Sequence, residues 1–351
     1  MARLLQNDDL SVDVLPDEGG RIASLKSRHS GLELLLQARR DRAQLPPGLH
    51  ARFRDGACAG IEECLPSVGA CTGDGESAEG APIPDHGDFW QLDWTVDGSN
   101  ETALSLNATG FSRPLRLRKR ILLHNNSLRM DYSVENLSDR PTSFLYACHP
   151  LLTVAPGDRI ALPEEVTSLR LHSSRGDRLG THETILPWPI IPNLSHCDLS
   201  LALDESEHTA DMLYTKRLTE GWCGLYRSAA RQGVALRFNP GLLPYVGLWL
   251  CYGGWPEDGL EPRQYAVALE PTTAPYGTLT AAKQAGAAVQ LAVGASFHFT
   301  IEFAVSAPDI SLEAFRSFCG DGSQKHSKED SNDQWGRASS VSTSNGPSSK
   351  T

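Results

Sequence analysis

Three segments of the chain carry a titratable side chain next to a proline or a glycine. The side chains are those of His86, His149 and Glu270. Imidazole and carboxyl groups act as general acids and bases when their surroundings bring their pKa values near the working pH. These residue types therefore indicate proton-transfer chemistry if the fold brings them together. The spacing of these three residues along the chain does not show whether the fold brings them together.

Glu270 is the strongest of the three candidates. It follows an alternating run, 264–269, and directly precedes Pro271. Because proline cannot donate to a strand ladder, we expect the strand to end at Glu270. A carboxyl group at the end of an apolar strand is poorly hydrated, which tends to perturb its pKa. The alternative is a surface glutamate that opens a loop.

Aromatic side chains accompany the candidate residues. Trp90 and Trp94 follow His86 closely. Aromatic rings pack on the apolar face of a sugar while neighbouring polar groups bind its hydroxyls. Trp249 is a further candidate for such a platform, with a place in the core as the alternative. The histidines also have ordinary alternatives, a loop position for His86 and a core position for His149.

The composition excludes several classes of protein. The chain has 351 residues and a formal net charge of -11, with 32 Lys plus Arg against 43 Asp plus Glu. A nucleic-acid-binding protein needs a basic surface, so we expect no nucleic-acid partner. There is no run of eighteen apolar residues and no apolar signal segment after Met1, so we expect no membrane partner. The sequence does not indicate an oligomeric state.

The eight cysteines are scattered and form no C-x-x-C pair. This pattern is typical of reduced thiols in a cytoplasmic protein, and it favours neither a disulfide framework nor a metal site. The pair Gly19-Gly20 lies in a turn and is not part of a G-x-G-x-x-G signature. We therefore expect a cytoplasmic protein without a metal and without a nucleotide cofactor.

Alternation of apolar and polar residues dominates the chain, and long helical periodicity is nearly absent. Asn125-Asn126-Ser127 separates two alternating runs and predicts a hairpin. Many short strands separated by turns favour an all-β fold, a large antiparallel β-sandwich. The predicted strands are 10–15, 21–27, 32–36, 115–121, 128–134, 142–148, 233–238, 246–252, 264–269, 288–293 and 296–305.

Two regions depart from this pattern. Residues 52–88 are rich in Gly, Cys and acidic side chains, and we expect long loops there, of the kind that carry function or are disordered. Residues 320–351 are rich in serine and nearly free of apolar anchors. Such a segment cannot bury enough surface to offset its chain entropy. We therefore predict one domain over 1–319 and a disordered tail over 320–351.

The order of four motifs resembles the aldose 1-epimerase (galactose mutarotase-like) superfamily. The match runs from about residue 10 to 305, and it implies a twisted β-supersandwich, in agreement with the predicted strands. The motifs are 14–25, Pro84-Asp85-His86-Gly87 followed by Trp94, 130–136 leading to His149-Pro150, and Glu270-Pro271-Thr272.

The resemblance also implies an activity, the interconversion of the α and β anomers of a free sugar. Glu270 matches the general base, which takes the proton of the anomeric hydroxyl. His149 matches the general acid, which protonates the ring oxygen. His86 matches a histidine that binds the substrate, and Asp85 beside it is a further binding candidate. No cofactor is implied, and the partner is a small carbohydrate.

The chain departs from the family pattern after the histidine–glycine pair. Many members carry an arginine there that reaches the sugar, whereas the residues after Gly87 include none. Arg52 or Arg54 could supply the missing guanidinium. Residues 60–66 resemble a motif of an uncharacterised epimerase-like branch. Within it, Glu62 or Glu63 would line the pocket, unless both are solvated loop charges.

Three other readings stay open. The same scaffold could serve a non-catalytic carbohydrate-binding protein, because a fold does not determine a function. A glycoside hydrolase or a lyase would need a second carboxylate, for which Glu62, Glu63 and Asp85 are candidates. A phosphorylated sugar would need a basic clamp. The run 116–120 is basic, and an exposed strand face explains it equally well.

Overall fold

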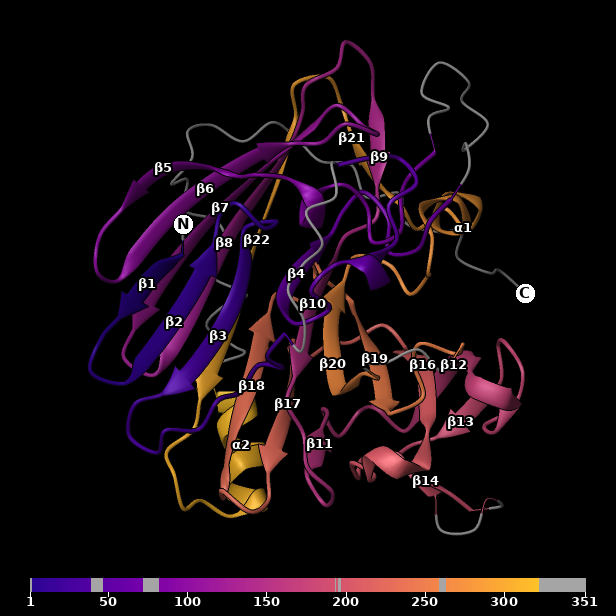
Figure 1. Cartoon of the computed structure of the whole chain (residues 1–351). Helices are drawn as coiled ribbons and strands as arrows, with labels where there is room; N and C mark the ends of the chain where they lie inside the picture. The colour runs from indigo at the N-terminus through magenta and orange to yellow at the C-terminus, as the bar shows by residue number, and fades with distance from the viewer. Residues whose placement is uncertain are drawn as a thin grey trace.

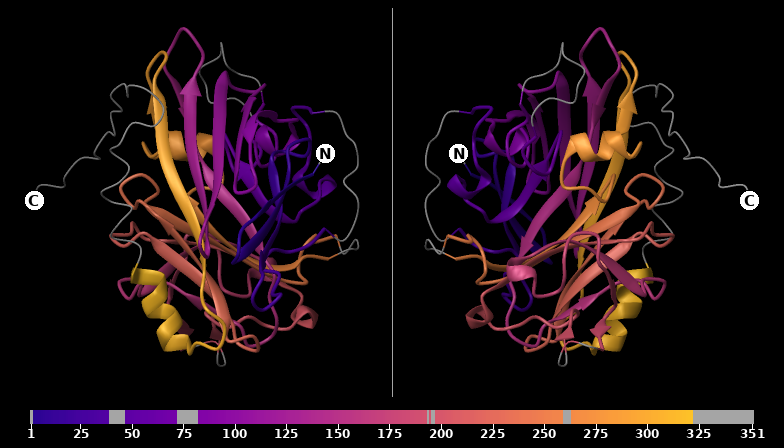
Figure 2. Two further views of the ribbon diagram at one scale, coloured as in Figure 1. Left: turned by 90° about the vertical axis from the view of Figure 1, so that its left-hand side faces the viewer. Right: turned by 90° about the vertical axis from the view of Figure 1, so that its right-hand side faces the viewer.

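The computed structural model describes residues 2–38, 47–71, 82–192, 194, 197–258 and 263–321. Two large antiparallel sheets pack against each other (Figures 1 and 2). The ten-stranded sheet has the order β1-β2-β3-β4-β10-β20-β19-β16-β12-β13, and the eight-stranded sheet has the order β11-β17-β18-β22-β8-β7-β6-β5. This architecture confirms the predicted all-β antiparallel sandwich.

The ten-stranded sheet is built from both halves of the chain. Its strands are β1 (Arg3–Gln6), β2 (Leu10–Leu15), β3 (Arg21–Ser27), β4 (Gly60–Cys64), β10 (Ala147–Leu152), β12 (Ser168–Ser174), β13 (Ile185–Pro187), β16 (Thr209–Thr215), β19 (Tyr245–Tyr252) and β20 (Tyr265–Thr272).

The eight-stranded sheet contains the longest strands and the predicted hairpin. Its strands are β5 (Thr95–Ser99), β6 (Ala103–Thr109), β7 (Leu115–His124), β8 (Ser127–Asn136), β11 (Arg159–Ala161), β17 (Trp222–Arg227), β18 (Gln232–Phe238) and β22 (Ser296–Val305).

Shorter elements complete the described chain. They are the two-stranded pairs β9 (Thr142–Phe144) with β21 (Val289–Leu291) and β14 (Ile190–Ile191) with β15 (Cys197–Asp198), the helices α1 (Leu279–Gln284) and α2 (Leu312–Asp321), and the 3-10 turns η1 (Phe53–Asp55), η2 (Phe89–Gln91), η3 (Arg175–Asp177) and η4 (Glu205–Glu207). Neither described α-helix is long and apolar enough to cross a membrane.

Strand β7 shows how the sequence forms this sandwich. Its buried and partly exposed residues alternate over nearly the whole strand, because successive side chains point to opposite faces. Leu115, Leu117 and Ile121 point into the core between the sheets. Lys119 occupies a core position in the same alternation and is fully buried. The basic run 116–120 is therefore not a uniformly exposed face.

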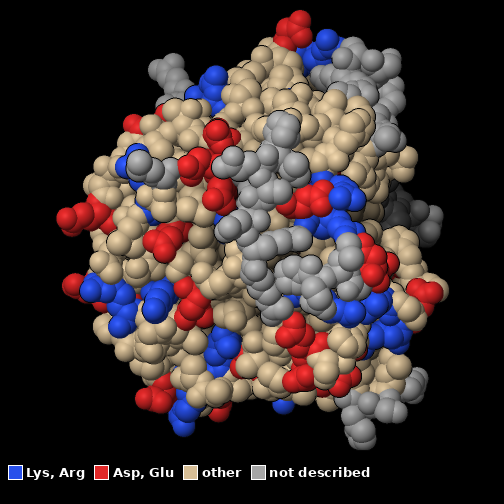
Figure 3. All heavy atoms as spheres, in the orientation of Figure 1, with Lys and Arg blue, Asp and Glu red and all other residues tan. Residues whose placement is uncertain are grey.

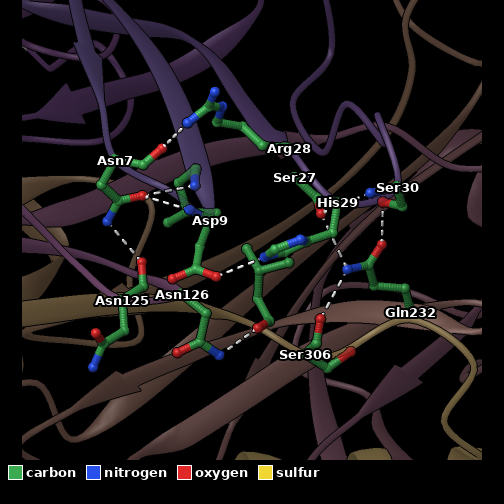
Figure 4. A network of polar contacts seen from close by, with 12 residues as sticks. Asn7, Asp9, Ser27, Arg28, His29, Ser30, Asn125, Asn126, Gln232 and Ser306 are labelled. Atoms are coloured by element: carbon green, nitrogen blue, oxygen red, sulfur yellow. Dashed lines mark hydrogen bonds and ion pairs between the residues drawn. The ribbon is translucent and has the colours of Figure 1, made fainter.

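Polar side chains connect the two sheets at one edge (Figure 4). The Asn7 amide donates to the backbone oxygen of Asn125 at 2.8 Å. The Ser30 hydroxyl donates to Gln232 at 2.6 Å, and the Gln232 amide donates to the backbone oxygen of Ser306 at 2.8 Å. Because these bonds join the loops around β2 and β3 to the ends of β7, β18 and β22, they help to hold the sheets in register.

The surface of the described residues carries both signs of charge. Figure 3 shows Lys and Arg side chains interspersed with Asp and Glu on the face in view. Mixed signs of this kind are typical of a solvated surface and give that face no extended basic region.

Several predicted elements differ from the structure. Residues 32–36 form two isolated bridges rather than a strand, at Glu33 and Leu35. The predicted strand 142–148 divides into β9 and β10. Neither α1 nor α2 was predicted, and α2 continues to Asp321, two residues beyond the predicted end of the domain. Residues 322–351, the rest of the predicted tail, lie outside the described residues.

Strand β4 lies in the region predicted to be loops, and it is a central strand of the ten-stranded sheet. All five of its residues are buried. A strand buried on both faces shows no alternation, which explains why periodicity missed it.

Strand β20 does not end at Glu270 as predicted, but continues through Pro271 to Thr272. Its ladder with β10 pairs Ala147 with Thr272 and then Leu151 with Ala268, without bridges between these points. The interrupted stretch contains Pro150 and Pro271, each of which lacks a backbone N–H. A central strand can therefore contain Pro271, because the neighbouring ladder is open there.

Candidate active site

A cavity of about 260 Å³ lies on the face of the ten-stranded sheet that points away from the eight-stranded sheet. Five adjacent strands contribute to its lining. They contribute His149 from β10, Glu270 from β20, Trp249 from β19, Tyr214 and Met212 from β16, and His172 and Ser173 from β12. Pockets that hold small ligands usually measure about 300–1,000 Å³, so this cavity suits a small molecule.

The strand register explains how residues distant in sequence meet here. His149 pairs with Glu62 on one side, and the register of β10 with β20 places Glu270 on its other side. Glu270 pairs with Gly247, which in turn pairs with Tyr214. Side chains directly opposite each other on antiparallel strands lie on the same face. Because they are paired in this way across the sheet, His149, Glu270 and Tyr214 all point toward one cavity.

His149 and Glu270 form a close pair at the base of the cavity. The His149 Nε2 atom lies 3.6 Å from Glu270 Oε1. The two residues are only 5% and 2% exposed. Nε2 and Oε1 are therefore near each other in a site that excludes most water. Proton transfer between each of them and a bound molecule is geometrically feasible.

Burial shifts the pKa values of the pair in opposite directions. Burial raises the pKa of Glu270 to about 7, although the nearby charge of His86 opposes the rise. Burial lowers the pKa of His149 well below its ordinary value, His86 lowers it further, and Asp85 opposes this. Near neutral pH, Glu270 therefore exchanges its proton readily while His149 is neutral.

His86 is held beside this pair by the loop before η2. Its Nδ1 lies 2.9 Å from Asp85 Oδ1, and the other oxygen of Asp85 accepts the backbone N–H of Phe53 at 3.0 Å. The His86 and His149 rings lie 5.0 Å apart, centroid to centroid. Burial pushes the pKa of Asp85 upward, but its hydrogen bond with His86 holds the pKa below the ordinary value. Asp85 is therefore a carboxylate that orients His86.

Backbone geometry fixes the same loop. His86 and Gly87 both have positive φ angles, 60° and 74°. A side chain on Gly87 would collide with the backbone of Leu65, just after β4. A glycine is required there, because only glycine combines this conformation with so close an approach. The histidine–glycine motif thus positions His86 against the end of β4.

Phe53 is a lining residue that the sequence did not suggest. Its ring stacks on the His86 ring at 3.9 Å with an interplanar angle of 10°. It also meets the His149 ring edge-on at 5.2 Å. Because one apolar ring contacts both imidazoles, Phe53 limits their movement and excludes water from between them.

Tyr214 is a second functional candidate that was missed. Its hydroxyl is buried and has no hydrogen-bond partner among the described residues, and the same holds for Glu270 Oε2 and His149 Nδ1. A side chain on Gly247 would come within 3.1 Å of Glu270 Oε2 and 3.2 Å of the Tyr214 ring. Buried polar atoms normally have partners. Several unpartnered ones around a cavity indicate a polar ligand.

Trp249 lines the cavity, which is the position that an aromatic platform for a sugar needs. Its Nε1 donates to Gln264 Oε1 at 2.6 Å, which fixes the indole ring. It also packs against the small buried cluster of Leu151, Ala266 and Ala268. Trp249 is therefore partly packed and partly available to a ligand.

Glu62 and Glu63, two of the predicted site residues, are not part of the cavity lining. Glu62 pairs with His149 and is on the same face of the sheet, but it is buried and not part of the cavity lining, with Oε1 at 4.0 Å from Arg21 Nε. Glu63 points to the other face, where its oxygens accept hydrogen bonds from Lys119 at 3.0 Å and from Tyr132 and Tyr146. The expectation that Glu63 lines the pocket is therefore not supported.

Neither candidate arginine reaches the cavity. Arg52 is 63% exposed at its side chain and pairs with Asp55 at 2.8 Å. Arg54 pairs with Asp258 at 2.7 Å. Of the described residues that line the cavity, none is an arginine or a lysine. Within the described part of the chain, no three His, Cys, Asp or Glu side chains are arranged to hold a metal ion.

The fold is shared with several solved structures. The Slr1438 protein from Synechocystis sp. PCC 6803 superposes with a TM-score of 0.65 at 17% identity, over 87% of this chain and 96% of that one. A galactose mutarotase related enzyme from Lactobacillus acidophilus gives 0.60 at 17% identity, over 89% and 100%. A galactose mutarotase-like protein from Lactobacillus casei gives 0.61 at 14% identity, over 87% and 100%. At these identities the likeness shows the fold.

A comparison with curated proteins found no match. Residues 2–173 match the family model for aldose 1-epimerase. The matched segment contains Asp85, His86 and His149, whereas Glu270 and Trp249 lie beyond it. The family model and the fold agree with the resemblance seen in the sequence motifs. Residues 2–173 of this chain are thus similar to the aldose 1-epimerase family, and the fold is that of the galactose mutarotase-like structures.

Proposed function

We propose that this protein is a mutarotase-like isomerase that interconverts the anomers of a free sugar. One observation carries the proposal. His149 and Glu270 lie opposite each other on adjacent strands, 3.6 Å apart and almost fully buried at the base of a small cavity. The aldose 1-epimerase family match over residues 2–173 supports the same reaction class.

The reaction needs one proton acceptor and one proton donor. In the cyclic sugar, Glu270 takes the proton of the anomeric hydroxyl while His149 gives a proton to the ring oxygen. The bond between the anomeric carbon and the ring oxygen breaks, which leaves an aldehyde and a free hydroxyl. After rotation about the neighbouring carbon–carbon bond, the hydroxyl attacks the other aldehyde face. The two protons then return to His149 and to the anomeric oxygen.

The pKa values of His149 and Glu270 indicate which of the two residues holds the proton when no sugar is bound. The pair holds one proton between the depressed pKa of His149 and the raised pKa of Glu270, about 7. In the free site that proton is on Glu270. Transfer to His149 generates the state that opens the sugar ring. Ring opening itself leaves Glu270 protonated by the anomeric hydroxyl and His149 neutral, which is the state that closes the ring. Both states therefore belong to the one-proton form of the pair.

The remaining polar atoms of the cavity suit sugar hydroxyls. His86 is fixed by Asp85, and the Tyr214 hydroxyl has no partner among the described residues. Trp249 offers an aromatic surface held by Gln264. A sugar ring carries hydroxyls on its edge and C–H groups on its faces, which matches this combination of donors and ring surface.

The test replaces Glu270 with glutamine, which keeps the shape of the side chain and removes its basicity. A positioned proton-transfer group contributes about 10²–10⁴ in rate. We expect Glu270→Gln to lower the rate of anomer exchange at least a hundredfold, measured by polarimetry or exchange NMR, while sugar binding persists. Glu135→Gln, at a partly exposed position of strand β8, is the control and should leave the rate unchanged. Unchanged turnover in Glu270→Gln would refute the assignment.

A non-catalytic carbohydrate-binding protein is the second candidate. The absence of arginine and lysine from the described lining residues favours it, because the family pattern that the sequence resembles includes an arginine that reaches the sugar. In that case the unmodified protein would bind sugars without accelerating anomer exchange. A cytoplasmic location also stays a prediction, based on the scattered thiols.

A further inference from the structure

The cavity is longer than a single sugar ring requires. Neighbouring strands lie about 4.8 Å apart, so β12 is about 14 Å from β20 across the sheet. The proton-transfer pair lies at one end of this width, on β10 and β20. His172 and Ser173, on β12, lie at the other end. A sugar ring held against His149 and Glu270 therefore leaves the His172 end for a further group.

A second cavity of about 390 Å³ adjoins that end. His172 and Gly277 line both cavities, so the two meet at these residues. The wall of the second cavity combines one aromatic ring, Tyr276, with hydrogen-bonding side chains that include Thr278 and Gln284. This is the same combination of ring surface and polar groups as in the first cavity.

Gly277 determines how closely the two cavities approach each other. A side-chain carbon on Gly277 would lie 2.7 Å from His172 Nε2 and 2.9 Å from its Cε1. Such a contact is shorter than real side chains make, so a larger residue would push the imidazole away. The glycine therefore allows the His172 ring to form the junction between the cavities.

One arginine connects the walls of the two cavities. The guanidinium carbon of Arg170 lies 5.6 Å from the ring centroid of Tyr214 and 5.3 Å from that of Tyr276. Its two terminal nitrogens donate to the Glu183 carboxylate and to the backbone oxygen of Pro275. Because Arg170 is held by these partners, it fixes Tyr214 of the first cavity relative to Tyr276 of the second.

We propose that the second cavity is a subsite for an uncharged sugar ring, so that the preferred substrate is a reducing disaccharide. The reducing-end ring would lie against His149 and Glu270, and the second ring would pass His172 to reach Tyr276. This choice of substrate class rests on the proposed mutarotase function.

The charges around the second cavity favour a neutral sugar over a phosphate. Both terminal nitrogens of Arg170 already have partners, and one partner is the carboxylate of Glu183, which lines this cavity. Burial lowers the pKa of His172, helped by His182 and Arg170, so its imidazole is uncharged near neutral pH. A phosphate dianion would face a carboxylate without a free guanidinium to offset it. Hydroxyls carry no such penalty.

The experiment compares anomer exchange for glucose, maltose and glucose 6-phosphate by exchange NMR, in the full chain and in Tyr276→Ala. We expect maltose to have about a tenfold higher kcat/KM than glucose. We expect Tyr276→Ala to remove most of that advantage and to change the glucose value less than twofold. Gln290→Ala, an exposed substitution on β21, is the control. Gly277→Val should also act against maltose, because it displaces His172.

Each alternative outcome overturns the subsite. Equal kcat/KM for glucose and maltose, with Tyr276→Ala affecting both alike, would show that the second cavity does not contact substrate. Preference for glucose 6-phosphate, with binding that weakens steeply as salt rises, would show an anion site.

Failure of the proposed function gives a different result. If no sugar exchanges its anomers faster than in buffer, calorimetric titration with maltose and glucose replaces the kinetics. Tighter binding of maltose that Tyr276→Ala abolishes supports the subsite without catalysis. Equal affinity for the two sugars, or an unchanged preference in Tyr276→Ala, refutes it.

Discussion

Two buried carboxylates of the same sheet, on strands β4 and β20 to either side of β10, have opposite environments. Glu63, on the core face of β4, has hydrogen bonds to both oxygens, from Lys119, Tyr132 and Tyr146. Glu270, on the cavity face of β20, has one oxygen 3.6 Å from His149, and its other oxygen has no partner among the described residues. One carboxylate is satisfied by the protein, and the other is left for a ligand.

The difference separates a structural role from a functional one. A fully satisfied buried network stabilises one arrangement of the chain, because breaking it leaves an uncompensated charge. Burial without compensating partners disfavours the ionised form of Glu270, and its pKa therefore rises to about 7. Burial alone therefore does not identify a catalytic carboxylate, and our proposal for Glu270 rests on burial together with an unpartnered oxygen beside a cavity.

The largest effect on stability should come from breaking the hydrogen-bond network around Glu63. Lys119→Met removes the cation and leaves the Glu63 carboxylate buried, so we expect a loss of about 3–5 kcal/mol in the free energy of unfolding. Denaturant unfolding measures this loss. Lys119→Met combined with Glu63→Gln removes both charges and should recover part of it. An unchanged midpoint in Lys119→Met would mean that the network does not support the fold.

Glu270→Gln should increase the stability of the fold at high pH. Because folding raises the pKa of Glu270 from 4.5 to about 7, the folded chain holds that proton more tightly than the unfolded chain between those values. The ionised group therefore destabilises the fold progressively as pH rises from 4.5 to 7. Glutamine removes this penalty, so we expect a gain of about 3 kcal/mol at pH 8 and almost none at pH 4. Equal gains at both pH values would contradict the raised pKa.

The pH dependence of turnover should be bell-shaped. The pair holds its single proton below the pKa of Glu270, about 7, and above the depressed pKa of His149. We expect kcat/KM to fall about tenfold per pH unit above the alkaline limit near 7. The acid limb should lie well below the ordinary histidine pKa. A rate that rises through pH 7 to a plateau would show that the pair works without a shared proton.

The smallest effect should come from Tyr214→Phe. The substitution removes a buried hydroxyl that has no partner in the described structure, so stability should hold or rise slightly. If the hydroxyl bonds a sugar oxygen, kcat/KM should fall about two- to tenfold, as expected for one neutral hydrogen bond of about 0.5–1.5 kcal/mol. Tyr252→Phe, at another buried unpartnered hydroxyl outside the cavity lining, is the matched control for turnover.

The sequence alone predicted the sandwich but not its centre. Strands with one solvated face, such as β2 and β7, alternate clearly, and their positions were predicted well. Strand β4 is buried on both faces, so its sequence lacks that signal. The continuation of β20 through Pro271 depends on an open ladder beside it, which only the pairing with β10 reveals.

The candidate site was predictable only in part. The motifs indicated His149 and Glu270, yet their opposition results from a register between strands more than a hundred residues apart. Tyr214 and Phe53 had no local signal, because their importance comes from what lies across the cavity. Glu62 and Glu63 were considered together, although the period of a strand must send adjacent side chains to opposite faces.

The order of the ten-stranded sheet has a consequence for biosynthesis. After β10, the chain crosses to β12 and returns through β16 and β19, so that β20 is the last of these strands to be made and fills the place beside β10. Until residue 272 has left the ribosome, the edges of β10 and β19 that face the position of β20 are unpaired, and Glu270 is not yet beside His149. A product truncated before β20 would thus lack the candidate site and be prone to self-association through unpaired edges. The eight-stranded sheet is completed later still, because β22 fills the place between β18 and β8 only after β20 has been made.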